Sequence, residues 1–491
     1  MKLSRHALAF CTAFCFFACV GPADETAVNP QISKIAADVS EDRMKAIIEK
    51  LVSFGTRNTM SDPTDPARGV GAARQWILEQ FQSYSPKLQV RFEKFRVKKQ
   101  GQRIFKDVDL YNVIAVLPGK TMPETEVWIT GHYDSINLGN RTPAAQTSSA
   151  STSGPGATEN PLSVTQNMTP ADFEKAAALP APGACDDGSG TAAVMELARV
   201  MSQYEFDKTL VFAAFAGEEQ GLIGSSLEAA KAHKEKEAIE AVLNNDIIGT
   251  DQSGNGRFGN TSVNVYSDET MDSPSQQLSR YVREIAERYI PAMKVDTIFM
   301  GDRLGRGGDH TPFQWEGYAA VRLSTPNEIY ANQHHATDLL ENMSVPYTAK
   351  VARVNGVVAA SLALSPKAPN VMRQPPPPRA WEKTDGPTPP LPRRPTPMIS
   401  RGKSGYDALL QWKPAGPDTA IKGYAIVIRP TTSPYWEQEI YVGKVTEYLM
   451  KDVSIDDMKF GVKAIGVDGG ESLVAPYVYP PRAKTEIQTV Q

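Results

Sequence analysis

A series of short apolar segments separated by helical patterns is the feature that most restricts the fold of this chain. Residues 88–97 alternate between apolar and polar like a strand, and amphipathic helical patterns occupy 40–54, 69–84, 189–204 and 273–289. Buried-strand patterns recur at 111–118, 126–131, 209–216, 241–249, 263–267 and 319–324. Apolar strands that alternate with amphipathic helices favour a largely parallel sheet covered by helices. We therefore predict an α/β sandwich of three layers over residues 39–365, with a mostly parallel mixed sheet.

The pattern changes after residue 365. Residues 366–398 contain 12 prolines and predict a stiff, extended linker without a core. Short alternating strands separated by turn residues follow over 399–481, which predicts a small all-β sandwich, and a short tail occupies 482–491. Trp412, Tyr424 and the stretch "VKAIGVDGGES" resemble the fibronectin type III domain. We expect this second domain to bind a surface, a polymer or the catalytic domain.

The N-terminus has the layout of a secretory signal peptide. Lys2 and Arg5 precede an apolar stretch from Ala7 to Val20, and small residues follow up to Ala23. We predict a signal peptide over 1–23, a flexible leader over 24–38, and export to the periplasm or the extracellular space. A lipid anchor at Cys19 is the alternative to cleavage near Ala23. Later stretches lack the ~18 apolar residues of a transmembrane helix.

Net charge and cysteine content indicate which partners the chain can bind and whether disulfides stabilise it. The formal net charge of -4 gives no indication of nucleic-acid binding. Three of the four cysteines lie in the predicted signal peptide, so the mature chain keeps only Cys185 and has no internal disulfide. The fold must then depend on its core, on metal, or on both.

Acidic residues and histidines recur where predicted strands end. The clusters are "GHYDS" (131–135), "CDDGSG" (185–190), "GEEQG" (217–221), "NNDIIG" (244–249) and "NQHHATD" (332–338). Ligands of open α/β sheets bind at the carboxyl ends of the strands. The candidate metal ligands are His132, Asp186, Glu219, Asp246 and His334. Two imidazoles and three carboxylates suit zinc, and five donors suit two ions with a shared carboxylate.

Taken together, these clusters resemble those of the co-catalytic di-zinc aminopeptidases, a family that also includes glutamate carboxypeptidase II and the glutaminyl cyclases. The matching pieces are "GHYDS", "GACDDGSG", "FAGEEQGLIGS", "NNDIIG", "GGDHTPF" and "QHHATD", in the family's order over roughly residues 40–365. The resemblance implies a zinc-exopeptidase-like fold, two Zn²⁺ ions and peptide substrates. It also implies a cis peptide bond between Asp186 and Asp187.

The resemblance implies a role for each matching residue. His132 and Asp246 would hold one zinc ion, Glu219 and His334 the other, and Asp186 would bridge them. Glu218 would be the general base that takes a proton from the water activated by the metal. Asp134, two residues after His132 on extended backbone, can take the other imidazole N–H and orient the ring.

Two departures from the family pattern stand out. His334 and His335 are adjacent where relatives have one histidine, and the spacing to Asp338 selects His334. Residues 139–183 form a longer connection than usual, which predicts a long surface insertion. Neither departure removes a candidate ligand.

The sequence leaves several functions open. We expect an exported aminopeptidase, with a carboxypeptidase or dipeptidase of the same family as the alternative. A glutaminyl cyclase ranks lower, because those enzymes work with one zinc ion. A non-enzymatic binding protein with a relict site ranks lowest, because the ligand set and Glu218 are both present. The sequence has no HExxH and no GxSxG motif, which removes those hydrolase classes.

Overall fold

The computed structural model of the chain describes residues 28–139, 168–375 and 394–480. The predicted signal peptide, with Cys19, and the tail over 482–491 lie outside these residues, as does the middle of the insertion. The helices of the larger domain are α1 (Pro30–Asp38), α2 (Glu41–Ser53), α3 (Gly69–Tyr84), α4 (Pro170–Ala176), α5 (Gly188–Met201), α6 (Ile223–Glu235), α7 (Pro274–Tyr289), α8 (His310–Trp315) and α9 (Val345–Leu364). In the described part of the chain, none of the helices is both long and apolar enough to cross a bilayer.

One mixed sheet of eight strands forms the centre of the larger domain, in the order β1-β2-β4-β3-β5-β8-β6-β7. Its strands are β1 (Gln89–Val97), β2 (Val108–Leu117), β3 (Met122–His132), β4 (Lys208–Phe215), β5 (Ala238–Asn245), β6 (Ser262–Tyr266), β7 (Lys294–Ile298) and β8 (Ala320–Ser324). The four central strands β4, β3, β5 and β8 are parallel to one another. Antiparallel pairing occurs between β1 and β2, β2 and β4, and β6 and β8.

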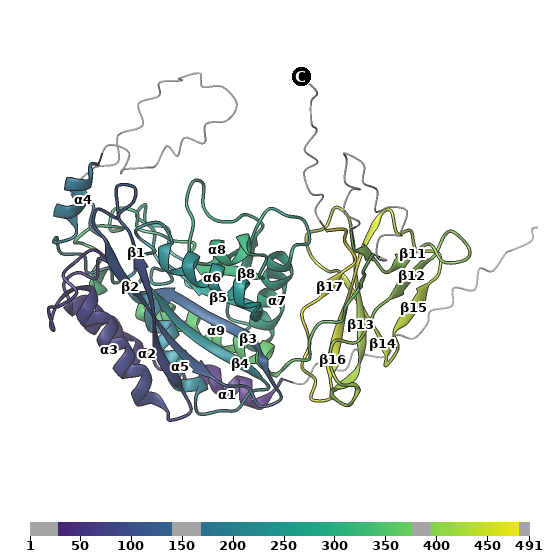
Figure 1. Ribbon diagram of the computed structural model, residues 1–491. Helices are drawn as coiled ribbons and strands as arrows, with labels where there is room; N and C mark the ends of the chain where they lie inside the picture. The colour runs from purple at the N-terminus through teal and green to yellow at the C-terminus, as the bar shows by residue number, and fades with distance from the viewer. Residues whose placement is uncertain (1–27, 140–167, 376–393, 481–491) are drawn as a thin grey trace, which may run out of the picture.

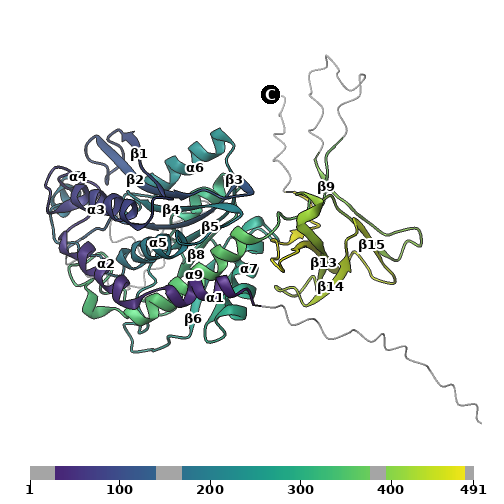
Figure 2. The same cartoon turned by 90° about the horizontal axis from the view of Figure 1, so that it is seen from below.

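Helices cover both faces of this sheet, which confirms the predicted three-layer α/β sandwich (Figures 1 and 2). The larger core contains residues of α1, α2, α3, α5, α7 and α9 on one face. The second core, on the other face, joins Trp128 of β3 and Phe215 of β4 to Ala229 of α6 and Phe313 of α8. Because β4 is buried along its whole length, its residues 210–215 are all apolar rather than alternating.

This topology fixes where the chemistry can occur. Strands β3, β4 and β5 are parallel, so their carboxyl ends meet at the same edge of the sheet. β3 ends at His132, β4 ends two residues before Gly217, and β5 ends just before Asp246. The polar clusters of the sequence therefore converge at one edge.

Two of the predicted boundaries are wrong where the structure describes them. The predicted flexible leader contains helix α1, capped by Asn29, and its Ile32 and Ile35 are buried in the larger core. The predicted linker contains β9 (Met372–Arg373) and β10 (Thr396–Pro397), which pair with each other. Val371 and Met398 beside them are buried in the core of the C-terminal domain. A few apolar residues in each segment are buried in a neighbouring core. The composition of the segments does not indicate this burial.

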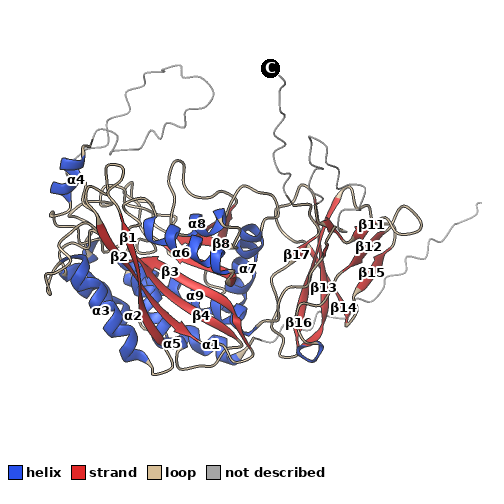
Figure 3. Ribbon diagram, viewed as in Figure 1, coloured by secondary structure: helices blue, strands red, loops and turns tan. Residues whose placement is uncertain are grey.

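The C-terminal domain consists of antiparallel sheets, shown on the right in Figure 3. One sheet has the order β11-β12-β15 and the other β14-β13-β16-β17. Their strands are β11 (Ile399–Ser400), β12 (Ala408–Gln411), β13 (Ile421–Pro430), β14 (Gln438–Gly443), β15 (Glu447–Met450), β16 (Met458–Gly466) and β17 (Ala475–Pro476). Trp412 and Tyr424 pack edge to face in the core, with ring centroids 5.4 Å apart.

A buried ion pair joins the two domains. Nη2 of Arg429 on β13 lies 2.7 and 2.8 Å from the two carboxylate oxygens of Asp272, in the turn before α7. The side chains of both residues are almost fully buried. Around this pair, Arg280 of α7 lies over the ring of Trp436, and Trp436 donates a hydrogen bond to Gln277.

We expect R429M to destabilise the protein by about 3–5 kcal/mol, because the buried carboxylate of Asp272 loses the arginine that contacts both its oxygens and keeps only Arg280 as a charged partner, 3.1 Å from Oδ1. The measurement is the free energy of unfolding in urea. R401M is the matched control, because Arg401 pairs with Asp456 on the exposed surface of the same domain. The control should lose no more than about 1 kcal/mol. Equal losses in the two variants would contradict a stabilising role for the domain contact.

Candidate metal centre

The five candidate ligands meet at the carboxyl edge of the parallel strands. His132 is the last residue of β3, Glu219 follows β4, and Asp246 follows β5. Asp186 lies just before α5, and His334 lies in the loop after β8. Their side chains form two neighbouring groups of metal-ligand type, His132 with Glu218 and Asp246, and Asp186 with Glu219 and His334.

Asp186 stands between the two histidines. Its Oδ1 lies 3.2 Å from Nε2 of His132, and its Oδ2 lies 3.3 Å from Nε2 of His334. The two imidazole nitrogens face different third partners. Nε2 of His132 is 3.8 Å from Oδ1 of Asp246, and Nε2 of His334 is 3.2 Å from Oε2 of Glu219. One carboxylate thus serves both groups, as a bridging ligand must.

The backbone of Asp186 is itself held in place. Asp338 accepts hydrogen bonds from the backbone N–H groups of Cys185, at 2.9 Å, and Asp186, at 3.0 Å. Asp187 caps α5 through the N–H of Gly190 and accepts the N–H of His132. The Asp186–Asp187 peptide bond is cis. The two adjacent acids make different contacts. The Asp186 side chain faces the two histidines, whereas the Asp187 side chain accepts hydrogen bonds from backbone N–H groups.

Asp134 connects the first histidine to the glutamate pair. Its Oδ1 lies 3.6 Å from Nδ1 of His132, and its backbone oxygen lies 3.1 Å from the same nitrogen. The Asp134 carboxylate also accepts the backbone N–H groups of Glu218 and Glu219, each at 3.3 Å. Either contact to Nδ1 leaves Nε2 directed at Asp186 and Asp246.

Charge and burial shift the pKa values of these groups strongly. Burial raises the pKa of a carboxyl group, yet His132 and His334 hold the pKa of Asp186 well below its ordinary value. Burial lowers the pKa of an imidazole, but Glu219 and Asp186 raise the pKa of His334 to about 10. Burial, with Glu219 and Asp246 nearby, raises the pKa of Glu218 well above its usual range. The cluster is a strongly negative site that attracts positive charge.

The side chains fit a metal ion. Nε2 of His132 and Oε1 of Glu219 are buried and have no hydrogen-bond partner within the described residues. Buried polar atoms without partners are costly, so a ligand for them is expected. Imidazole nitrogen and carboxylate oxygen are donors that zinc accepts. Two residues of the site have left-handed backbone, His334 at φ 58° and Ile247 at φ 56°, and such conformations concentrate at functional sites.

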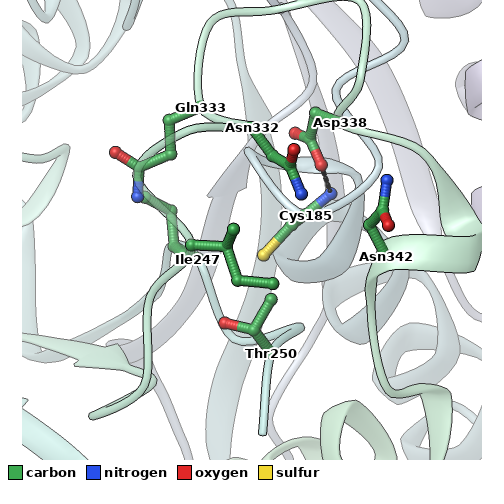
Figure 4. Close-up of a pocket in the computed structure, with 8 residues that line it drawn as sticks. Cys185, Ile247, Thr250, Asn332, Gln333, Asp338 and Asn342 are labelled. Atoms are coloured by element: carbon green, nitrogen blue, oxygen red, sulfur yellow. Dashed lines mark hydrogen bonds between the residues drawn. The ribbon is translucent and has the colours of Figure 1, made fainter. Parts of the chain in front are cut away.

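A small cavity of about 10 Å³ lies beside the centre, lined by residues adjacent to three of the candidate ligands (Figure 4). Cys185 precedes Asp186, Ile247 follows Asp246, and Gln333 precedes His334. Asn332 and Asn342 contribute amide groups to its wall. Burial raises the pKa of the Cys185 thiol well above its ordinary value, which keeps it protonated and fits a structural role.

Two supporting residues were not identified from the sequence. The guanidinium of Arg57 is fully buried and donates to the backbone oxygens of Leu51, Tyr133, Pro182 and Gly183. Burial lowers its pKa to about 10, which leaves it protonated at neutral pH. It joins the end of α2 to the loops of His132 and Asp186. The hydroxyl of Thr59 accepts the N–H of Gly217 and donates to Asp134.

Three further residues of the matching motifs, His335, Asp309 and His310, are not members of the two ligand groups. His335 is adjacent to His334, and its partial burial together with the charge of that imidazole lowers its pKa. Asp309 is fully buried near the cluster, and burial raises its pKa to about 7. His310 donates from Nε2 to the backbone oxygen of Gly301, so it shapes the loop before α8.

Comparisons with known proteins identify relatives of this chain. The sequence profile of peptidase family M28 matches residues 112–359. A "Probable zinc metalloprotease" of Pyricularia oryzae is 35% identical over 470 residues, covering 89% of this chain and 82% of that protein. A "Probable zinc metalloprotease" of Pyrenophora tritici-repentis is 31% identical over 487 residues, covering 92% of this chain and 98% of that protein.

Solved structures show the same fold. The crystal structure of the Legionella pneumophila LapA aminopeptidase superposes with a TM-score of 0.50 and 17% sequence identity. The match covers 74% of this chain and 80% of the LapA chain. At this identity the likeness shows the fold alone and not the substrate.

Replacing Thr59 tests the hydroxyl that links Gly217 to Asp134. We expect T59V to cost about 1–3 kcal/mol, because an isosteric methyl group leaves the buried N–H of Gly217 unsatisfied. Urea unfolding measures the loss. T59S keeps the hydroxyl and should retain most of the stability. If T59V were as stable as the wild type, the hydrogen bonds of the Thr59 hydroxyl would not contribute to stability.

Proposed function

The chain belongs to peptidase family M28 and is a zinc metallopeptidase, and from this premise we propose that it is an exported aminopeptidase with two zinc ions. The observation that carries the proposal is the position of Asp186, whose two oxygens face different histidines at 3.2 and 3.3 Å. One group of ligands would be His132 and Asp246, the other Glu219 and His334. Asp186 would be shared between them.

Zinc at such a centre supplies Lewis acidity, which lowers the pKa of water and polarises a carbonyl group. Glu218 is the residue that moves the proton. Its carboxylate lies in the group of His132 and Asp246, while its neighbour Glu219 points to His334. A raised pKa makes Glu218 a stronger base than an exposed glutamate. It can therefore accept a proton from the attacking water and pass it to the leaving amine.

The charge around the centre favours recognition of an amino terminus. Besides the ligands, the half-buried Glu218 and the buried Asp309 place two further carboxyl groups near the centre, and each attracts the ammonium group of a peptide when it is ionised. Three arginines near the cluster already have partners in the protein. Arg57 is bound to backbone oxygens, Arg322 to Asp302 and Asp246, and Arg103 to the backbone oxygen of Glu219 at 2.5 Å. A terminal carboxylate needs an uncommitted arginine or lysine.

Conservative changes in the glutamate pair should separate the two roles. We expect E218Q to keep both zinc ions but to lose about 10²–10⁴-fold in kcat, because the general base is gone. E219Q should instead lose zinc, since it removes a ligand. Zinc per chain, measured by elemental analysis next to kcat, distinguishes the two effects. Equal zinc loss in both variants would contradict this division of roles.

The substrate class is tested with aminoacyl-nitroanilides beside N-blocked peptides, with and without a chelator. We expect chelator-sensitive release of the N-terminal residue and no cleavage of N-blocked peptides. Release of the C-terminal residue from blocked peptides would establish the carboxypeptidase alternative. Formation of pyroglutamate from glutaminyl peptides without hydrolysis would establish the cyclase. Activity that survives complete zinc removal would rule out the metal mechanism.

A further inference from the structure

Arg322 is an arginine in the middle of a strand whose other residues are mostly apolar. It lies on β8, paired in register with Asn244 of β5, two residues before Asp246. Its side chain is fully buried. A buried guanidinium is rare, and it is retained only when opposite charge and hydrogen bonds compensate its desolvation.

The guanidinium divides its contacts between two carboxylates. Nη1 donates to both oxygens of Asp302, at 2.7 and 2.6 Å. Nη2 lies 3.1 Å from Oδ1 of Asp246 and donates to the backbone oxygen of Asp246 at 3.3 Å. Nε has no partner within the described part of the chain. Since Asp302 uses a single nitrogen, the other is left for Asp246.

We propose that Arg322 is a positioning residue that holds Asp246 in the orientation of a metal ligand, and that Asp302 holds Arg322. The inference rests on the proposed function, in which Asp246 binds zinc. One carboxylate oxygen of Asp246 is fixed by Nη2, so the rotation of the carboxylate is restricted before metal arrives. Groups that orient a ligand in this way typically contribute 10–100-fold to metal affinity.

Asp302 also solves the electrostatic difficulty of placing an arginine there. An uncompensated positive charge 3.1 Å from Asp246 would compete with zinc for the same carboxylate. Asp302 also pairs with Arg303, which pairs with Glu328 in turn. The two arginines and two acids are therefore neutral together, and Arg322 supplies orientation without net charge. The guanidinium geometry matters as well, because a lysine cannot contact both carboxylates with separate nitrogens.

Gly308 keeps this arrangement compact. A Cβ atom at this position would lie 3.0 Å from Oδ2 of Asp246 and 3.3 Å from Cδ of Arg322. The backbone of the loop before α8 therefore packs directly on the carboxylate that Arg322 holds. Side-chain rotation of Asp246 is limited from both sides.

Zinc affinity of R322M tests the proposal without any substrate. Competition with a chromophoric chelator measures both zinc ions. We expect affinity at the position of His132 and Asp246 to fall about tenfold or more, while the ion at Glu219 and His334 is retained. R322K should not restore the loss. R429M is the matched control, because it breaks another buried arginine–aspartate pair and should leave zinc affinity unchanged.

The double variant D302N/R322M separates positioning from simple charge balance. If R322M alone fails to fold, the double variant also removes the buried acid that R322M leaves with Arg303 as a partner. We expect its zinc affinity to stay low, because Asp246 still lacks its partner. Wild-type affinity in the double variant would overturn the proposal, since Arg322 would then only neutralise Asp302. Wild-type affinity in R322M would overturn it as well. If the variants lose zinc as expected but the wild-type protein shows no peptidase activity, the proposed function is refuted and the positioning role of Arg322 is not.

Discussion

Burial of many acidic side chains at one edge of the sheet is the constraint on which the rest of the larger domain depends. Asp134, Asp186, Glu219 and Asp246 are almost fully removed from solvent within a few ångströms of one another. Charges buried together cost several kcal/mol each unless opposite charge lies close by, and a protein's whole stability is only about 5–15 kcal/mol. The histidines, the buried Arg57 and Arg322, and zinc when bound supply this opposite charge. Loss of metal is therefore expected to affect stability as well as activity.

The parallel strands explain why the acids can be placed so accurately. β3, β4 and β5 deliver their last residues to one edge, and each is fixed along its length by neighbours on both sides. Loops alone would leave the carboxylates free to move apart under their mutual repulsion. Arg57 then joins the loops of His132 and Asp186 through backbone oxygens, which adds positive charge without occupying a ligand. The sheet fixes the positions of the carboxylates, and the Arg57 guanidinium offsets part of the repulsion between them.

The sequence predicts the parts of this arrangement that follow from local pattern. The buried strands, the clusters at their ends and the choice of His334 by its spacing to Asp338 are all readable from residue types, and the structure brings His334 to Asp186 and Glu219. Arg57, Thr59 and Arg322 are different, because each acts through contacts distant in sequence. Arg57 reaches residues up to 126 positions away, and nothing in its local pattern indicates them. The sequence contains one indication of Arg322, because it is a charged residue within a mostly apolar strand. Helix α1 was missed because two isoleucines in a polar segment do not show that they face a core.

The loop between β7 and α8 connects the second domain to the metal centre. Phe299 packs against Tyr435 of the C-terminal domain, and Arg280 of α7 lies over the Phe299 ring. Three residues later Asp302 binds Arg322, which reaches Asp246. The backbone N–H of Gly301 is held by Glu269, in the turn that also contains Asp272. The same short segments therefore take part in the domain contact and in the support of a candidate ligand.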